Sequence, residues 1–366
     1  MGCEIDLEVI KTADSKITTK NGTKYLDFEG GWCVGNVGWN KKQLIDAMKN
    51  YVGPVYISPD YKSERREELA EKLTDLTSKN YTCFMATGGT EAVEIALKTA
   101  KAYNKKEKFL AFKNAYHGHS LNCFALTGRH ADKFGAHDKS FTQVEFQNWD
   151  KTKADVISAI SKGDVCAFVT EPILTHLGVL IPPRDFFTDI YKVCKENDTV
   201  FIADEVATGF GRCGKWFAYQ NYDFQPDIIA SSKGITSGHA VLGTTMVTHE
   251  VAESMKFDYS TYSTFGWHPI SVEVALANIE YFKKNKIIEN SKQTSIYLLQ
   301  KLNEFTKAHG IGMSICLDGK YEKLAEKCRK DGLIISNAGK QPALYPALNI
   351  TKEDIDKALQ ILKKHC

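Results

Sequence analysis

Short apolar runs alternate with helical patterns through the middle of this 366-residue chain. The runs that predict buried strands lie at 109–112, 121–126, 165–170, 199–203, 227–231 and 244–248. The helical patterns between them lie near 91–104, 151–162 and 184–197. Strands that alternate with helices predict an α/β fold, in which helices cover both faces of a mostly parallel sheet.

The pattern turns helical toward the C-terminus. The expected helices are 270–285, 287–308, 320–331 and 352–364. This change predicts a large ligand-binding domain over 41–285 and a smaller domain over 286–366. The first segment, 1–40, contains a possible strand at 23–28, and we expect it to pack on the smaller domain or on a partner chain.

Charge and composition exclude several classes of function. The 47 Lys and Arg residues nearly balance the 45 Asp and Glu residues, so the net charge of +2 gives no field for nucleic acid or anionic membranes. No apolar run approaches the roughly 20 residues that span a bilayer, and the N-terminus lacks a secretory pattern. The ten cysteines are scattered without metal-ligand spacing, which predicts no metal site and a reducing cytoplasm.

A glycine pair opens one helical pattern at Gly88, Gly89 and Thr90. The free N–H groups at the start of a helix bind phosphate, and glycines let the ligand approach the backbone. The alternative is an ordinary turn from strand to helix that Thr90 caps. A glycine pair alone does not decide between them.

An aromatic residue precedes His117 and Gly118 in the loop after the run at 109–112. Tyr116 could stack on a flat ring, or it could be a half-buried turn residue. A metal site made by the neighbouring histidines is rejected, because no carboxylate or cysteine completes a ligand set.

Charged residues also follow two of the apolar runs. Asp204 and Glu205 end the run at 199–203, and a buried carboxylate there needs a cation or a proton donor. An ion pair or a divalent metal would be the alternatives. Lys233 follows the run at 227–231, where a lysine held out of water can act as a nucleophile rather than as a surface charge. Thr264 precedes a helix, which it could cap, or it could hold an anion.

Taken together, these segments resemble the class III aminotransferases, which are fold-type I enzymes that use pyridoxal 5′-phosphate (PLP). The resemblance covers most of the chain, and its motifs follow in the family's order. They are Gly88-Gly89-Thr90-Glu91-Ala92, Tyr116-His117-Gly118, Glu171-Pro172, Asp204-Glu205-Val206, Thr208-Gly209-Phe210-Gly211-Arg212, Ser232-Lys233-Gly234 and Thr264-Phe265-Gly266. The resemblance implies a large domain with a mostly parallel sheet and a smaller α+β domain.

The resemblance also implies how the reactive parts of PLP are held. Lys233 would form the Schiff base with its aldehyde and later move a proton. Asp204 would pair with the ring nitrogen and keep it protonated. Gly89 and Thr90 would hold the phosphate.

Further residues of the implied cofactor site surround the ring. Tyr116 and Val206 would pack on its two faces, and His117 would belong to the same site. Glu171 would lie near the cofactor, although a structural role is as well supported. Thr264 would reach the phosphate of the partner's cofactor, which implies a homodimer with shared sites.

The sequence departs from the family where many members bind an α-carboxylate. The stretch 339–351 has no arginine, and His176 stands where a glutamate often pairs with that arginine. Position 207, often a glutamine, is alanine. Arg129, Arg184 or a lysine could replace the missing clamp, or the substrate could lack a carboxylate at that end.

The predicted function is therefore PLP-dependent transamination. An amino donor and a carbonyl acceptor would react in turn, in a specialised biosynthetic pathway. Three alternatives stay open at this stage. They are another PLP reaction (racemase, aminomutase or decarboxylase), a non-catalytic scaffold of the same fold, and an unrelated phosphate-binding enzyme.

Overall fold

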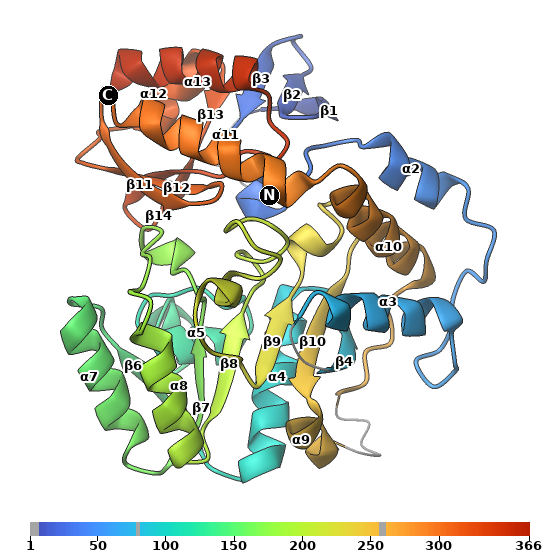
Figure 1. Cartoon of the computed structure of the whole chain (residues 1–366), viewed down its shortest axis with the longest axis vertical. Helices are drawn as coiled ribbons and strands as arrows, with labels where there is room; N and C mark the ends of the chain where they lie inside the picture. Colours follow the sequence, from blue (N-terminus) through green and yellow to red (C-terminus); the bar gives the residue numbers. More distant parts are fainter. Residues whose placement is uncertain (1–6, 78–80, 256–260) are drawn as a thin grey trace.

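The computed structural model describes residues 7–77, 81–255 and 261–366. Its centre is a seven-stranded sheet in the order β4-β10-β9-β8-β7-β5-β6 (Figure 1). The strands are β4 Tyr81–Ala86, β5 Lys108–Phe112, β6 Phe141–Val144, β7 Val165–Thr170, β8 Val200–Asp204, β9 Ile228–Ser231 and β10 Gly243–Thr248. The strand β10 runs antiparallel between β4 and β9, and the other strands of this sheet all run in one direction. The mostly parallel sheet is therefore confirmed.

Helices cover both faces of this sheet, as the alternating pattern predicted. In β8, Phe201 packs in one apolar cluster with Phe187 of α8 (Phe186–Glu196). The next residue, Ile202, packs in another cluster with Val93 of α4 (Gly89–Asn104). Successive strand side chains point to opposite faces, which places the two helices on opposite sides. The remaining helices of this part are α2 Lys42–Lys49, α3 Glu64–Asp75, α6 Ala131–Phe134, α7 Trp149–Ile160, α9 His249–Ala252 and α10 Pro269–Lys284.

The strand expected at 121–126 is wrong, because this segment forms the helix α5, Leu121–Thr127. The Ser120 hydroxyl accepts a hydrogen bond from the Cys123 N–H at 3.1 Å and so caps the helix start. Gly128, with φ of 68°, ends the helix in the left-handed region. The successive residues 123–126 of this run are all buried, as they would be in a central strand, so hydrophobicity alone did not distinguish a helix from a strand.

The N-terminal strands pair with the C-terminal part of the chain. Strands β1 Val9–Ala13, β2 Lys16–Thr19 and β3 Lys24–Asp27 form a sheet with β13 Leu333–Ile334. In this sheet Leu26 is the register partner of Leu333. The domain boundaries at 40/41 and 285/286 stay predictions.

The C-terminal part combines a second sheet with helices. The sheet has the order β11-β12-β15-β14, from β11 Lys307–Ile311, β12 Ser314–Asp318, β15 Gln341–Leu344 and β14 Ser336–Ala338. The helices are α11 Ile287–Leu302, α12 Leu324–Lys330 and α13 Lys352–His365. The helix expected over 287–308 is therefore too long, since α11 ends at Leu302 and β11 follows.

A fully buried arginine joins three distant segments above the sheet. Arg212 donates to the carbonyl oxygens of Met313 and Pro346, at 3.1 and 2.6 Å, and to the Asn36 side-chain oxygen at 2.7 Å. The Asn36 amide donates in turn to the Phe210 carbonyl oxygen at 2.7 Å. These bonds fix the N-terminal segment and the C-terminal part over the ends of the central strands.

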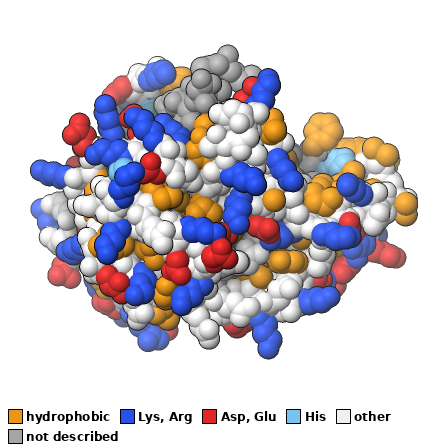
Figure 2. All heavy atoms as spheres, turned by 90° about the horizontal axis from the view of Figure 1, so that it is seen from above, with side chains coloured by type: hydrophobic (Ala, Val, Ile, Leu, Met, Phe, Trp, Pro, Cys, Tyr) orange, Lys and Arg blue, Asp and Glu red, His pale blue; other side chains and the backbone are white. Residues whose placement is uncertain are grey.

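No helix in the ranges 7–77, 81–255 and 261–366 is long and apolar enough to cross a membrane. Figure 2 shows acidic and basic side chains intermixed over one face of the molecule, without a continuous field of either sign.

Candidate active site

A cavity of about 140 Å³ opens where the central strands end. Asp204 is the last residue of β8, Glu171 directly follows β7, and Lys233 lies two residues after β9. Such strand ends are where α/β sheets bind ligands. The lining residues are Gly89, Thr90, Tyr116, His117, Gly118, Glu171, His176, Asp204, Val206, Ala207 and Lys233.

Asp204 is a buried carboxylate with a histidine partner. Its side chain is 4% exposed, and one carboxylate oxygen lies 2.7 Å from Nδ1 of the fully buried His117 ring. The other oxygen accepts the Val206 N–H at 3.0 Å. The Nε2 atom of His117 has no hydrogen-bond partner within the described ranges. The pair holds Asp204 in one orientation at the cavity wall.

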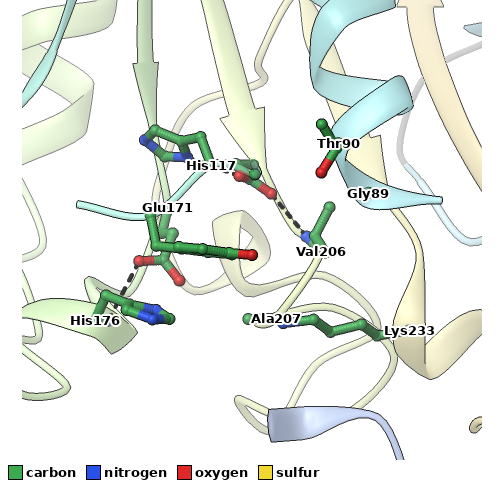
Figure 3. A pocket seen from close by; sticks show the side chains of 11 residues that line it. Gly89, Thr90, His117, Glu171, His176, Val206, Ala207 and Lys233 are labelled. Carbon is green, nitrogen blue, oxygen red and sulfur yellow. Dashed lines mark hydrogen bonds and ion pairs between the residues drawn. The ribbon is translucent and has the colours of Figure 1, made fainter. Parts of the chain in front are cut away.

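Glycines keep the start of α4 open. A Cβ at Gly89 would lie 2.7 Å from the Val206 side chain. A Cβ at Gly118, where φ is 130°, would lie 2.7 Å from the Thr90 hydroxyl oxygen. Side chains at these positions would fill the space in front of the first N–H groups of the helix. Figure 3 shows Gly89 and Thr90 on one side of the cavity, with His117 and Glu171 on the other.

Lys233 occupies a strained backbone position at the start of a short turn, Lys233–Ile235. Its φ of 43° lies in the left-handed region that non-glycine residues rarely adopt. The Asn278 amide of α10 fixes the turn by donating to the carbonyl oxygens of Gly234 and Ile235, at 2.9 and 3.0 Å. Strain of this kind persists where the surroundings enforce it, and it is common at functional sites.

The imidazole of His176 is part of an aromatic stack at the cavity wall. Its ring lies 4.6 Å from Tyr116 and 6.0 Å from Trp32, centroid to centroid, with nearly parallel planes. Burial, aided by the positive charges of Arg129 and Lys233, lowers the pKa of His176 to about 3. The side chain is therefore neutral near pH 7.

Glu171 holds the turn that carries His176. Its carboxylate accepts hydrogen bonds from the Thr175 hydroxyl and from the His176 N–H. Burial raises the pKa of Glu171 to about 7. This carboxylate lines the cavity and also positions the neutral histidine within it.

Glu205 does not face the cavity, although it neighbours Asp204 in the sequence. Its carboxylate accepts the N–H groups of Ala218 and Tyr219, at 2.9 and 2.8 Å, and the Thr208 hydroxyl at 2.5 Å. These bonds tie the end of β8 to the turn at 218–221. Glu205 therefore serves the fold rather than the site.

The structure brings every predicted site residue to the cavity except Thr264. That residue is exposed, and its carbonyl oxygen accepts the Tyr56 hydroxyl at 3.0 Å. Sequence reasoning missed Gly118 as a lining residue, and it missed a second cavity that shares His176, Ala207 and Lys233. That cavity is also lined by Trp32, Cys33, Thr175, Asn337, Ala338 and Tyr345.

Trp32 reaches the site from an unusual turn in the N-terminal segment. The four residues Gly30–Cys33 all have φ between 59° and 65°, so the turn is left-handed. The glycine pair before Trp32 was the only local signal for it in the sequence.

Comparison with known proteins places this site within one family. The model of the aminotransferase class-III family matches residues 3–366. The chain belongs to the class III aminotransferases.

An acetylornithine aminotransferase of Archaeoglobus fulgidus is 31% identical over 348 residues, which cover 93% of this chain and 91% of that protein. A Bacillus anthracis aminotransferase structure matches with a TM-score of 0.90 at 28% identity, covering 98% of this chain and 92% of that one. An (S)-enantioselective omega-transaminase of Thermomicrobium roseum matches with a TM-score of 0.90 at 25% identity, covering 98% and 92%.

The enzyme is therefore a PLP-dependent aminotransferase of fold type I, and transamination is favoured over the other PLP reactions considered from the sequence. The cavity fits this cofactor. The glycine-framed helix start suits a phosphate, and the buried Asp204 carboxylate suits a protonated ring nitrogen.

Proposed function

We propose that Lys233 and Asp204 are the catalytic residues of this aminotransferase. The observation that carries the proposal is their convergence with the glycine-framed start of α4 on one cavity. When bound, PLP supplies an aldehyde and a ring that accepts electrons. The remaining chemistry is the task of the protein's own side chains.

Each side chain has a distinct task in this proposal. Lys233 binds the cofactor covalently through Nζ, and the same atom later removes and returns a proton at the substrate carbon. Asp204 holds a proton at the ring nitrogen, and His117 keeps the Asp204 carboxylate in place. Gly89 and Thr90 bind the phosphate at the helix start.

The walls of the cavity orient the cofactor and the substrate. Tyr116 and Val206 pack against the ring, and Glu171 positions His176 beside it. An amino donor and a carbonyl acceptor react in turn, in a specialised biosynthetic pathway of the cytoplasm. The residues where many members bind an α-carboxylate differ in this chain, so its substrate is not held by the family's usual arginine clamp.

The proposal includes a homodimer with shared sites. Exposed apolar side chains gather in the segment 52–61, at Val52, Val55, Tyr56 and Tyr61. The Tyr56 hydroxyl donates to the Thr264 carbonyl oxygen, which brings this segment and the exposed Phe265 into one apolar patch beside Thr264. The Tyr56 and Phe265 rings meet edge to face at 6.2 Å. Apolar patches of this kind mark protein–protein contacts, and a partner seated here would receive Thr264 at its own cofactor.

Replacing Asp204 by asparagine tests the catalytic assignment. An amide cannot hold the ring-nitrogen proton electrostatically, so we expect turnover to fall by at least about 100-fold while PLP still binds. The measurement is turnover per bound cofactor, with absorbance reporting occupancy. Asp223→Asn, which changes an exposed ion pair with Arg184, is the control and should keep full activity. Near-normal turnover in Asp204→Asn would contradict the assignment.

A further inference from the structure

The stretch 339–351 lacks the arginine with which many family members bind a substrate carboxylate. The structure shows which of the chain's other arginines lies where it could take that role. This inference rests on the proposed function, because it concerns the substrate of the same site. The chain has six arginines, and four of them already have partners. Arg65 pairs with Glu273 and Glu68, Arg66 donates to backbone carbonyls, Arg184 pairs with Asp223, and Arg212 is enclosed between the N- and C-terminal segments.

The two remaining arginines differ in position. Arg329 lies on α12, which packs against β13 and α13 in the upper part of Figure 1. Arg129 lies beside the cavity, with its guanidinium carbon 5.7 Å from the centre of the Tyr116 ring. Tyr116 itself lines the cavity. Arg129 is thus the arginine that lies next to the site and has no ion-pair partner among the described residues.

The guanidinium of Arg129 has free hydrogen-bonding capacity. The side chain makes no hydrogen bond or ion pair to a described residue, and its backbone N–H is held by the Thr127 hydroxyl at 3.3 Å. The residue is half-buried, directly after Gly128 ends α5. The positive charge of Arg129 acts on the cavity residue His176, because after burial it is the largest cause of the lowered pKa of that histidine.

The acids of the cavity are already engaged. Asp204 is held by His117 and by the Val206 N–H, and Glu171 accepts from Thr175 and from the His176 backbone. A guanidinium resting on an aromatic face is pre-organised, and its planar donor set matches a carboxylate. We propose that Arg129 binds an anionic group of the substrate at the Tyr116 side of the cavity. The substrate then carries a carboxylate, or a sulfonate of similar chemistry, apart from its reacting amine or carbonyl.

The test compares two donors that differ only in the anionic group. 5-Aminopentanoate and pentylamine are each given to the PLP-loaded enzyme without an acceptor, so that only the donor half-reaction is followed by absorbance. The variants are Arg129→Gln and Arg129→Lys, with Arg184→Gln as the matched control on an exposed, paired arginine. Calorimetry with glutarate, an unreactive dicarboxylate, measures anion binding independently of turnover.

We expect Arg129→Gln to lower the second-order rate constant of the half-reaction with 5-aminopentanoate by about 10- to 100-fold. A loss of this size is typical for removing a charged hydrogen bond. Pentylamine should change by less than about threefold, and Arg129→Lys should recover part of the loss. Glutarate binding should weaken in parallel. Aminopropanesulfonate as a third donor distinguishes a sulfonate from a carboxylate site.

Three outcomes would overturn the inference. They are equal losses for both donors, unchanged glutarate binding in Arg129→Gln, or a fall in molecular mass showing that Arg129 serves a subunit contact instead. The two proposals can fail separately. If the wild-type enzyme transaminates no donor, but binds glutarate more tightly than Arg129→Gln does, the proposed function is wrong and the anion-binding role of Arg129 is supported.

Discussion

At the scale of single residues, burial and hydrogen bonding give different roles to two adjacent acids, Asp204 at the end of β8 and Glu205 directly after it. Asp204 reaches the cavity and meets His117, whereas the next side chain, Glu205, points away and accepts backbone N–H groups. Burial raises the pKa of Glu205 to about 7. The sequence offered both residues as candidates, and the hydrogen-bond partners that the fold brings to each of them separate their roles.

The raised pKa of Glu205 makes folding stability depend on pH. Its pKa is about 7 in the folded chain and near 4.5 when unfolded, so the folded state binds the proton more tightly. The stabilisation is complete below about pH 4.5 and is lost as the pH rises through 7. Glu205→Gln cannot titrate, so its unfolding free energy, relative to wild type, should increase between pH 5 and 7.5.

Urea unfolding across that pH range provides the measurement. Glu171 has its pKa raised in the same direction, so the variant should flatten the pH profile only in part. The exposed Glu107→Gln variant is the control and should follow the wild-type profile. Profiles of wild type and Glu205→Gln that run parallel would contradict the role given to this carboxyl group.

At the scale of elements, the central strands and their helices could be predicted, because local apolar patterning and burial agree there. The strands β5, β7, β8, β9 and β10 coincide with the expected runs. Glu171, Asp204 and Lys233, which the sequence places at or just after strand ends, therefore line the cavity as expected. The failure at α5 came from a short helix in which the successive residues 123–127 are all buried, so no helical period is visible there.

Long-range contacts explain what the sequence did not reveal. The position of Trp32 depends on the C-terminal part of the chain, since a Cβ on Gly30 would lie 2.5 Å from the Tyr345 carbonyl oxygen. The sequence did not distinguish Arg129 from Arg184 as a carboxylate ligand, and the position of Arg129 against the Tyr116 ring in the fold does so. No local pattern encodes the approach of Gly30 to Tyr345, which lie 345 − 30 = 315 positions apart in the chain.

The left-handed turn at Gly30–Cys33 can be tested against a matched glycine. Gly30→Ala meets both an unfavourable φ of 59° and a clash with backbone, so its destabilisation should exceed the roughly 1–2 kcal/mol of left-handed backbone strain. Gly22→Ala has φ of 85° but open space around it, so it should show the strain alone. Urea unfolding compares the two, and equal losses would contradict the close packing of the turn.

At the scale of the whole molecule, the patch around Thr264 predicts that the enzyme is a dimer in solution. Val55→Glu places a charge in that patch, and it should halve the molecular mass measured by light scattering. PLP should also dissociate more readily from this variant, because Thr264 of each chain would no longer reach the partner's cofactor.

Ile296→Glu alters another exposed apolar residue, on α11, and should leave the mass unchanged. A monomeric wild-type enzyme with tightly bound cofactor would contradict the shared site.

The central claim is that Lys233 binds the cofactor covalently. The direct test is borohydride reduction of the PLP-loaded enzyme, followed by digestion and mass mapping of its peptides. We predict that the added mass is found on the peptide containing Lys233, the lysine two residues after β9. A label fixed on another lysine, or a protein that takes up no cofactor, would contradict the account.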